Sequence, residues 1–223
     1  MSTFDRVLTP SQGAVIATNK VIRNTYMLLS VTLIFSAIMA GVSIAVGLSS
    51  GAAMIASLGA IGLLWLVLPR TENSAAGLAV VFGITGLLGL GLGPMLSHYM
   101  AIPGGGKLVA TALGGTGVMF LGLSGYALTT KRDFSFMGGF LFVGLIVALA
   151  AMVANIFMEI PALSLAISAV VVLLMSGMIL FDTSRIINGG ETNYLRATVS
   201  LYLDLYNLFI HLLHLLSAFS GRD

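Results

Sequence analysis

Seven long apolar runs, separated by short polar or turn-forming segments, constrain this chain of 223 residues more than any other feature. A run of about 20 apolar residues is long enough to cross the hydrocarbon core of a bilayer as a helix. Only 8% of the residues are charged, whereas a soluble domain carries about a quarter. The sequence therefore predicts an all-α membrane protein with seven transmembrane helices. The spans are expected at 26–48, 52–68, 75–97, 108–128, 137–158, 162–181 and 198–219.

The chain divides into two parts in this interpretation. Residues 1–25 are predicted to form an N-terminal tail that is open to a processive protease, and residues 26–223 to form the seven-helix bundle. Seven spans leave no room for a separate soluble domain. The chain has no cysteine, which excludes disulfides and thiolate metal sites.

The distribution of basic residues predicts the orientation, because cytoplasmic segments of membrane proteins are enriched in Lys and Arg. With the N-terminus in the cytoplasm, most basic residues fall on cytoplasmic segments. These residues are Arg6, Lys20, Arg23, Arg70, Lys131, Arg132, Arg185 and Arg196, against Lys107 and Arg222 on the outer side. We therefore expect a cytoplasmic N-terminus, a periplasmic C-terminus and a multi-pass protein of the bacterial inner (plasma) membrane.

Glycines lie mostly inside the apolar runs. Small residues let membrane helices approach closely, so these glycines are expected at contacts between helices. The third span carries Gly83, Gly86, Gly89, Gly91 and Gly93, and the fourth carries Gly114, Gly115, Gly117, Gly122 and Gly125. Pro94 removes a helical hydrogen bond and predicts a kink in the third span.

Two aspartates stand out because a charge within a membrane span is costly and therefore indicates function. Asp182 closes the sixth predicted span, and Asp204 lies inside the seventh. Both fall toward the cytoplasmic side, Asp204 about 9 Å deep along its helix, and Arg70 is expected at the same level. Two neighbouring carboxylates in a low-dielectric site cannot both ionise cheaply. Asp182 and Asp204 are therefore expected to sense ions or protons as a coupled pair, latched by Arg70.

A stripe of polar residues follows one face of the seventh span. At 100° per residue, its members fall within an arc of about 80°: Ser200, Asp204, Asn207, His211 and His214. Such a stripe should face a wet cavity or other helices and not lipid. We interpret it as a candidate polar path from the aspartates toward the outside; the alternative is hydrogen bonding between helices.

Motifs of soluble enzymes are missing from the sequence, including the phosphate-binding loop and the H-E-x-x-H zinc motif. His98, His211 and His214 could together hold zinc as in seven-helix membrane hydrolases, but no acidic residue lies at a matching depth. We therefore expect no catalytic activity and no resident metal or cofactor. The basic residues are scattered along the chain, which argues against nucleic acid as a partner.

Several segments resemble the Bax inhibitor-1 family of seven-helix membrane proteins. The strongest likeness is residues 189–213, GGETNYLRATVSLYLDLYNLFIHLL, followed by Leu180-Phe181-Asp182 and by KRDFSF at 131–136. Residues 20–26, KVIRNTY, and 152–157, MVANIF, are similar to the bacterial branch whose members modulate the FtsH protease.

The resemblance implies a partner and a site. Members of that branch associate with FtsH, a membrane-anchored ATP-dependent protease, and restrain it. Other bacterial members act as pH-sensitive calcium leaks, and their gating residues map onto Asp182, Asp204 and Arg70. The leading hypothesis is thus an inner-membrane modulator of FtsH. The alternative is a proton-gated cation leak that binds Ca²⁺ transiently.

Overall fold

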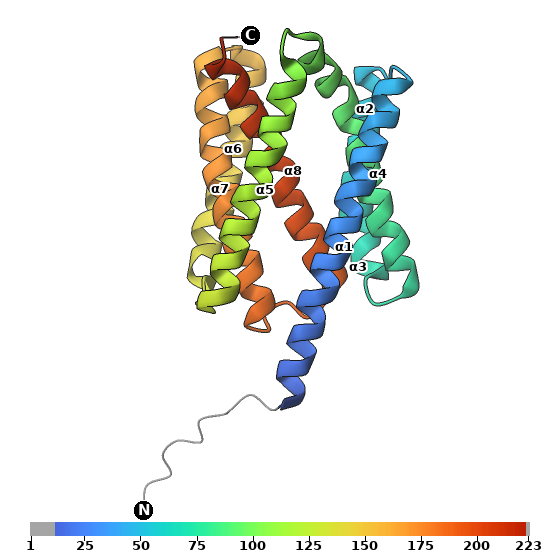
Figure 1. The fold of residues 1–223 in the computed structure, drawn as a ribbon, viewed down its shortest axis with the longest axis vertical. Helices are drawn as coiled ribbons and strands as arrows, with labels where there is room; N and C mark the ends of the chain where they lie inside the picture. Colours follow the sequence, from blue (N-terminus) through green and yellow to red (C-terminus); the bar gives the residue numbers. More distant parts are fainter. Residues whose placement is uncertain (1–11, 222–223) are drawn as a thin grey trace, which may run out of the picture.

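The structure, a computed structural model, describes residues 12–221 and is all-helical over this range (Figure 1). Among the described residues, seven helical segments are long and apolar enough to cross a membrane, which confirms the seven predicted spans. Six spans are α1 (Gln12–Ala45), α4 (Ala75–Ala101), α5 (Gly105–Thr130), α6 (Gly138–Met158), α7 (Pro161–Ile187) and α8 (Tyr194–Phe219). The remaining span joins α2 (Ser50–Gly62), η1 (Leu63–Val67) and α3 (Leu68–Thr71), and the short η2 (Ser135–Met137) precedes α6.

Two predicted boundaries differ most from the structure. Residues 12–25 of the predicted tail belong to helix α1, and Val21 and Ile22 of this segment pack against the core. Residues 1–11 of that tail lie outside the described residues. Helix α7 runs to Ile187, beyond the predicted end at residue 181, because its last turns are buried against the bundle. Asp182 therefore lies inside a helix and not at its end.

The second span contains an irregularity that the sequence analysis did not anticipate. Its middle, η1, is a π-helical turn in which the Leu68 amide donates to the Leu63 carbonyl, five residues back. Pro69 follows at once in α3, at a position where its missing amide hydrogen is tolerated. The extra residue in the π turn rotates the following side chains by about 100° relative to a regular helix.

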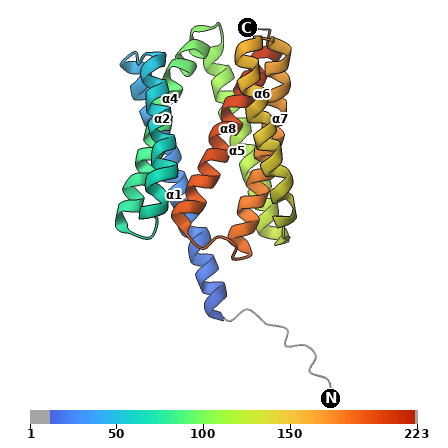
Figure 2. The ribbon, with the colours of Figure 1, turned by 180° about the vertical axis from the view of Figure 1, so that it is seen from behind.

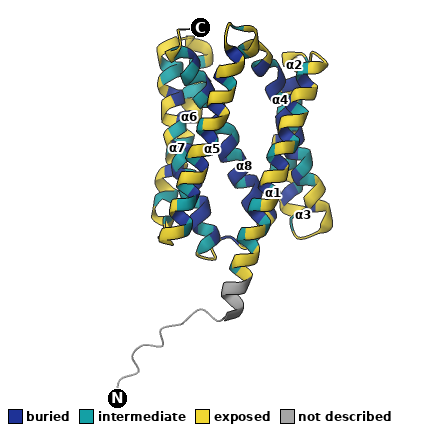
Figure 3. Cartoon of the chain, viewed as in Figure 1, coloured by how far each residue is buried: buried dark blue, intermediate teal, exposed yellow. Residues whose placement is uncertain are grey.

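The helices form two groups with α8 between them (Figures 1 and 2). The first group contains α1, α2, η1, α3 and α4, and the second contains α5, α6 and α7. Helix α8 crosses obliquely between the groups and contacts α1, α4, α5 and α7. Buried residues concentrate on α8 and on the helix faces turned toward it, whereas the outer faces of α2 and α6 are exposed (Figure 3). Those outer faces are apolar, as expected for surfaces that meet lipid.

The two groups use glycine differently. In α4 the predicted close packing is confirmed: a Cβ added at Gly86 would lie 2.8 Å from the Phe35 ring, and one at Gly89 would collide with the Ser36 backbone. In α5 the prediction is wrong for most positions, because a Cβ would meet nothing within 4 Å at Gly114, Gly117, Gly122 or Gly125. These α5 glycines point away from the neighbouring helices. Pro94 lies inside α4, which remains one helix, and its kink stays a prediction.

The loops lie at the two opposite ends of the bundle. The start of α1 and the loops α3–α4, α5–α6 and α7–α8 lie at one end, which we call the N-terminal end (Figure 1). The end of α8 and the remaining loops lie at the opposite end. The N-terminal end carries most of the described basic residues: Lys20, Arg23, Arg70, Lys131, Arg132, Arg185 and Arg196.

Candidate functional site

Two buried carboxyl groups meet between α7 and α8. Asp182 is 6% exposed and Asp204 is 5% exposed, and their carboxyl groups lie close enough to interact with each other. The two helices are consecutive and antiparallel, so the end of α7 lies beside the beginning of α8. The structure thus brings together the two aspartates that the sequence singled out. Their role as an ion or proton sensor stays a prediction.

Hydroxyl groups from three helices lie beside this pair. The Thr183 hydroxyl, next to Asp182 on α7, is 3.2 Å from the Ser124 hydroxyl of α5 and 3.4 Å from the Tyr26 hydroxyl of α1. Among the described residues, one oxygen each of Asp182 and Asp204, Oδ2, is buried without a hydrogen-bond partner. Buried polar atoms are normally satisfied, and the Thr25 hydroxyl of α1 is the third buried side-chain oxygen of the described residues without a partner.

The expected latch from Arg70 to the aspartates is not present in the described part of the chain. Arg70 is exposed, and its guanidinium donates to the carbonyl of Leu66 on its own helix. The π turn explains the difference, because it rotates Arg70 away from the direction that a regular helix would give it. The cation nearest to Asp182 is Arg185, one turn later on α7, at 3.9 Å.

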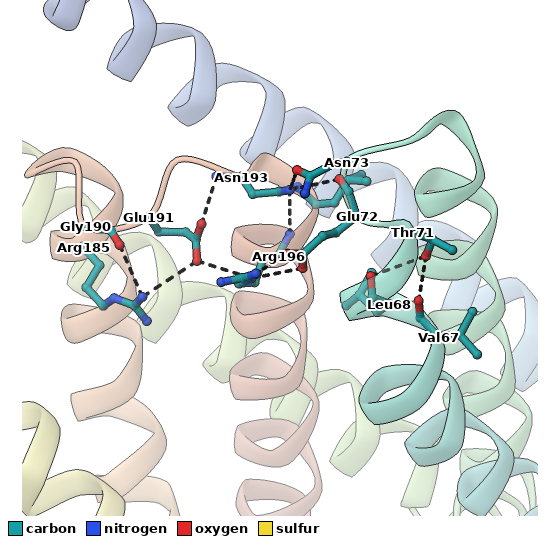
Figure 4. A network of polar contacts seen from close by, with 11 residues as sticks. Val67, Leu68, Thr71, Glu72, Asn73, Arg185, Gly190, Glu191, Asn193 and Arg196 are labelled. Carbon is teal, nitrogen blue, oxygen red and sulfur yellow. Dashed lines mark hydrogen bonds and ion pairs between the residues drawn. The ribbon is translucent and has the colours of Figure 1, made fainter.

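Arg185 begins a chain of charges that links the two groups of helices at the N-terminal end (Figure 4). Its guanidinium lies 3.8 Å from the Glu191 carboxylate, and Glu191 lies 3.9 Å from Arg196 of α8. Arg196 donates through two nitrogens to Glu72, in the loop between α3 and α4. Such a paired geometry is the stronger form of a charged hydrogen bond. The sequence Asp182–Arg185–Glu191–Arg196–Glu72, here called the charge chain, thus connects α7, α8 and the α3–α4 loop.

Asn193 ties the same three segments together through its amide. Its side-chain oxygen accepts from the amides of Leu195 and Arg196 and thereby caps α8. Its side-chain nitrogen donates to the Glu72 carbonyl at 2.9 Å and to the Asn73 side chain at 3.1 Å (Figure 4). One residue therefore starts α8 and fixes that start against the first group.

The grouping of these residues does not follow from the sequence. There, Arg185 and Arg196 count only as basic loop charges, and Glu72, Glu191 and Asn193 have no assigned role. A capping asparagine directly before an apolar helix is a recognisable signal. The pairing of Arg196 with Glu72 is not, because it joins residues far apart in the sequence.

The hydrogen-bond partners of the polar stripe on α8 differ toward the C-terminal end of the bundle. Ser200 and Asn207 are half-buried, and the Asn207 amide donates to the Leu203 carbonyl of its own helix. His211 and His214 both contact Ser168 of α7, with their Nδ1 atoms 3.0 Å and 2.8 Å from its hydroxyl oxygen. The two histidines therefore face α7, and the use of the stripe as a polar path stays a prediction.

The two histidines line cavities in this half of the bundle. One cavity of about 340 Å³ is bordered by His211, His214, Ser168 and Asn155, and a second of about 390 Å³ by His98, His214 and Ser217. Within the described residues, no three His, Asp or Glu side chains gather as a metal-ligand group.

Comparison with known proteins identifies the family. The family model described as "Inhibitor of apoptosis-promoting Bax1" matches residues 18–221. A membrane protein of Vibrio cholerae is 51% identical over 215 residues, 96% of both chains. The "Modulator of FtsH protease YccA" of Escherichia coli strain K12 is 50% identical over 222 residues, 99% of this chain and 100% of the relative.

A further relative, from Escherichia coli O6:H1, is named "Inner membrane protein YccA" and has the same identity and coverage. These names describe membrane proteins and a protease modulator, and none of them describes an enzyme. The predicted bacterial branch is thereby confirmed. The chain belongs to the Bax inhibitor-1 family and is a multi-pass protein of the inner membrane.

Proposed function

We propose that this chain binds the FtsH protease in the inner membrane and restrains it. The observation that carries this proposal is the 50% identity to the modulator YccA over nearly the whole of both chains. The match covers the loops as well as the apolar spans, because it includes 99% of this chain. The N-terminal segment and the lipid-facing helix surfaces are the parts that we assign to contact with FtsH.

The orientation that this function requires is a cytoplasmic N-terminus. Supporting it, the N-terminal end of the bundle carries seven of the described basic residues, whereas Lys107 lies at the opposite end. The absence of native cysteine makes the test simple. In intact cells, a membrane-impermeant maleimide should label Gly106→Cys and leave Ser74→Cys unlabelled until the cells are opened. The reverse pattern would overturn the orientation.

The restraint would act through competition. FtsH would engage residues 1–25 and then pull on α1, which is packed along α4 and α8. Extraction must therefore separate α1 from α8, which is the most buried helix of the bundle (Figure 3). A protease occupied by a slowly extracted chain is withheld from other substrates.

The test of this mechanism is removal of residues 2–11, which leaves α1 whole from Gln12. In cells containing FtsH, the shortened chain should have a longer half-life, and turnover of other FtsH substrates should rise toward the rate without the chain. The same deletion in cells lacking FtsH serves as the control. An unchanged half-life and unchanged substrate turnover would contradict engagement at this segment.

A proton-gated cation leak is the second candidate function, favoured by the contact between Asp182 and Asp204. The comparisons do not favour it over protease modulation. In proteoliposomes, Ca²⁺ flux that rises on acidification and is lost in Asp204→Asn would support a leak. Asp133→Asn, at an exposed loop aspartate, is the matched control. No flux at any pH leaves protease modulation alone.

A further inference from the structure

The contact of two imidazoles with one hydroxyl, in the C-terminal half of the bundle, goes beyond the proposed function. His211 and His214 lie one turn apart on α8, and both direct Nδ1 at the Ser168 hydroxyl of α7. Ser168 is 2% exposed, and His211 and His214 are half-buried.

The number of protons that the Ser168 hydroxyl and the two imidazoles can donate determines how they are protonated. A serine hydroxyl has one proton to donate and can accept from others, and a neutral imidazole carries its single proton on one nitrogen only. No third partner of the Ser168 hydroxyl is found among the described residues. Ser168 therefore donates to one Nδ1 and accepts from the other. One histidine is the Nδ1–H tautomer and the other the Nε2–H tautomer.

This asymmetric arrangement is what a proton wire needs. We propose that His211, Ser168 and His214 form a proton relay in the C-terminal half of the membrane span. A proton binds Nε2 of the Nδ1–H histidine, which passes its Nδ1 proton to the serine oxygen. The serine proton moves to the Nδ1 of the second histidine, whose Nε2 proton then leaves. One proton has crossed, and the two tautomers are exchanged. Each imidazole regains its starting tautomer by releasing one ring proton to cavity water and taking one from water at its other nitrogen, and rotation of the hydroxyl restores the start.

The cavities beside the two histidines and the polar face of α8 indicate where protons enter the relay and in which direction they move. The cavities of about 340 Å³ and 390 Å³ that share His214 have room for several water molecules. The other titratable groups bordering them are His98 and Tyr99 of α4, while α6 and α7 contribute Asn155, Ser164 and apolar side chains. On the inner side, Asn207 and Asp204 continue the same face of α8. Asp204 lies seven residues, or about 10.5 Å along the helix, from His211, and it is the next titratable residue on this face of α8.

A pair of isosteric substitutions tests the relay. Ser168→Thr keeps a hydroxyl group. Ser168→Val has the same shape as the threonine variant, but a methyl group stands in place of the hydroxyl and also excludes a bridging water. In proteoliposomes with an internal pH dye and a valinomycin-clamped potential, the wild-type chain and Ser168→Thr should take up protons faster than protein-free vesicles. Ser168→Val should be slower than Ser168→Thr, on the order of a hundredfold. Equal rates for the two variants, or wild-type flux no higher than protein-free vesicles, would overturn the proposal.

The tautomers give a measurement that does not depend on how the variants fold. Wild-type chain labelled with ¹⁵N-histidine in bilayers at pH 8 should show one Nδ1–H ring and one Nε2–H ring for His211 and His214. The third histidine signal is identified with His98→Gln. Two rings in the same tautomer would contradict the donor–acceptor pattern and with it the relay.

Discussion

The two groups of helices that flank α8 are both rich in glycine, but they are held together in different ways. In the first group, the glycines of α4 bring backbones together, and an added Cβ at Gly89 would collide with the Ser36 backbone of α1. In the second group, α6 and α7 fit through side chains, with Leu174 packed over Gly144 and Leu141 over Gly177. The α5 glycines at 114, 117, 122 and 125 have no neighbour within 4 Å of an added Cβ.

The difference follows from the position of each helix in the bundle. Helix α4 lies between α1 and α2 and also touches α8, so several of its faces are packed. Helix α5 lies at the edge and contacts α7 and α8 with one side, leaving the opposite side free of neighbours. Glycine permits close approach in lipid, but a partner helix must be there for the contact to form. Glycine content alone therefore cannot locate an interface.

The largest expected effect compares one glycine from each group. Gly89→Ala places a methyl group against the Ser36 backbone and should lower the free energy of unfolding by about 3 kcal/mol. Gly117→Ala meets open space and should raise it slightly, by up to about 1 kcal/mol, because alanine favours helix. Thermal unfolding in detergent, followed by the fluorescence of the single Trp65, measures both. Equal effects of the two changes would break the comparison between α4 and α5.

A smaller effect is expected where α8 is bonded to the first group. The Tyr202 hydroxyl lies 2.6 Å from the Ser36 hydroxyl, and both residues are buried. Tyr202→Phe leaves Ser36 without this partner and should cost about 1.5 kcal/mol of unfolding free energy. Tyr206→Phe is the matched control, because its hydroxyl makes only a 3.4 Å contact with the Leu88 carbonyl. A control as damaging as Tyr202→Phe would show that the loss is not due to this hydrogen bond.

The smallest effect on stability is expected at the charge chain. The effect on the distance between the two groups of helices is expected to be clear. Arg196 is 52% exposed, so the loss of its pairing with Glu72 in Arg196→Ala should cost only about 1 kcal/mol. The N-terminal ends of the two groups should nevertheless separate, because this bond joins α8 to the α3–α4 loop. Spin labels on Ser74→Cys and Asn188→Cys report the distance, with Arg132→Ala, another exposed arginine, as control. An unchanged distance would remove the charge chain from the contact between the groups.

The sequence revealed those features that depend on local pattern. Seven apolar runs became seven helical spans, and the cost of burying a charge singled out Asp182 and Asp204, which do meet. The position of Arg70 could not be read in this way, because a single π turn redirects it. Glu72 and Arg196 were equally hidden, since their pairing depends on how α8 crosses the bundle and not on any spacing in the sequence. The Ser168 bridge required the same knowledge of which α7 residue faces His211 and His214.

Co-reconstitution with the protease shows whether this chain restrains FtsH. FtsH is placed in proteoliposomes with ATP, a fluorescent membrane substrate and increasing amounts of the full chain. We expect the substrate to be degraded more slowly as the chain is added, and the chain lacking residues 2–11 to slow degradation less. Substrate degradation at an unchanged rate in excess of the full chain would contradict restraint of FtsH by this chain.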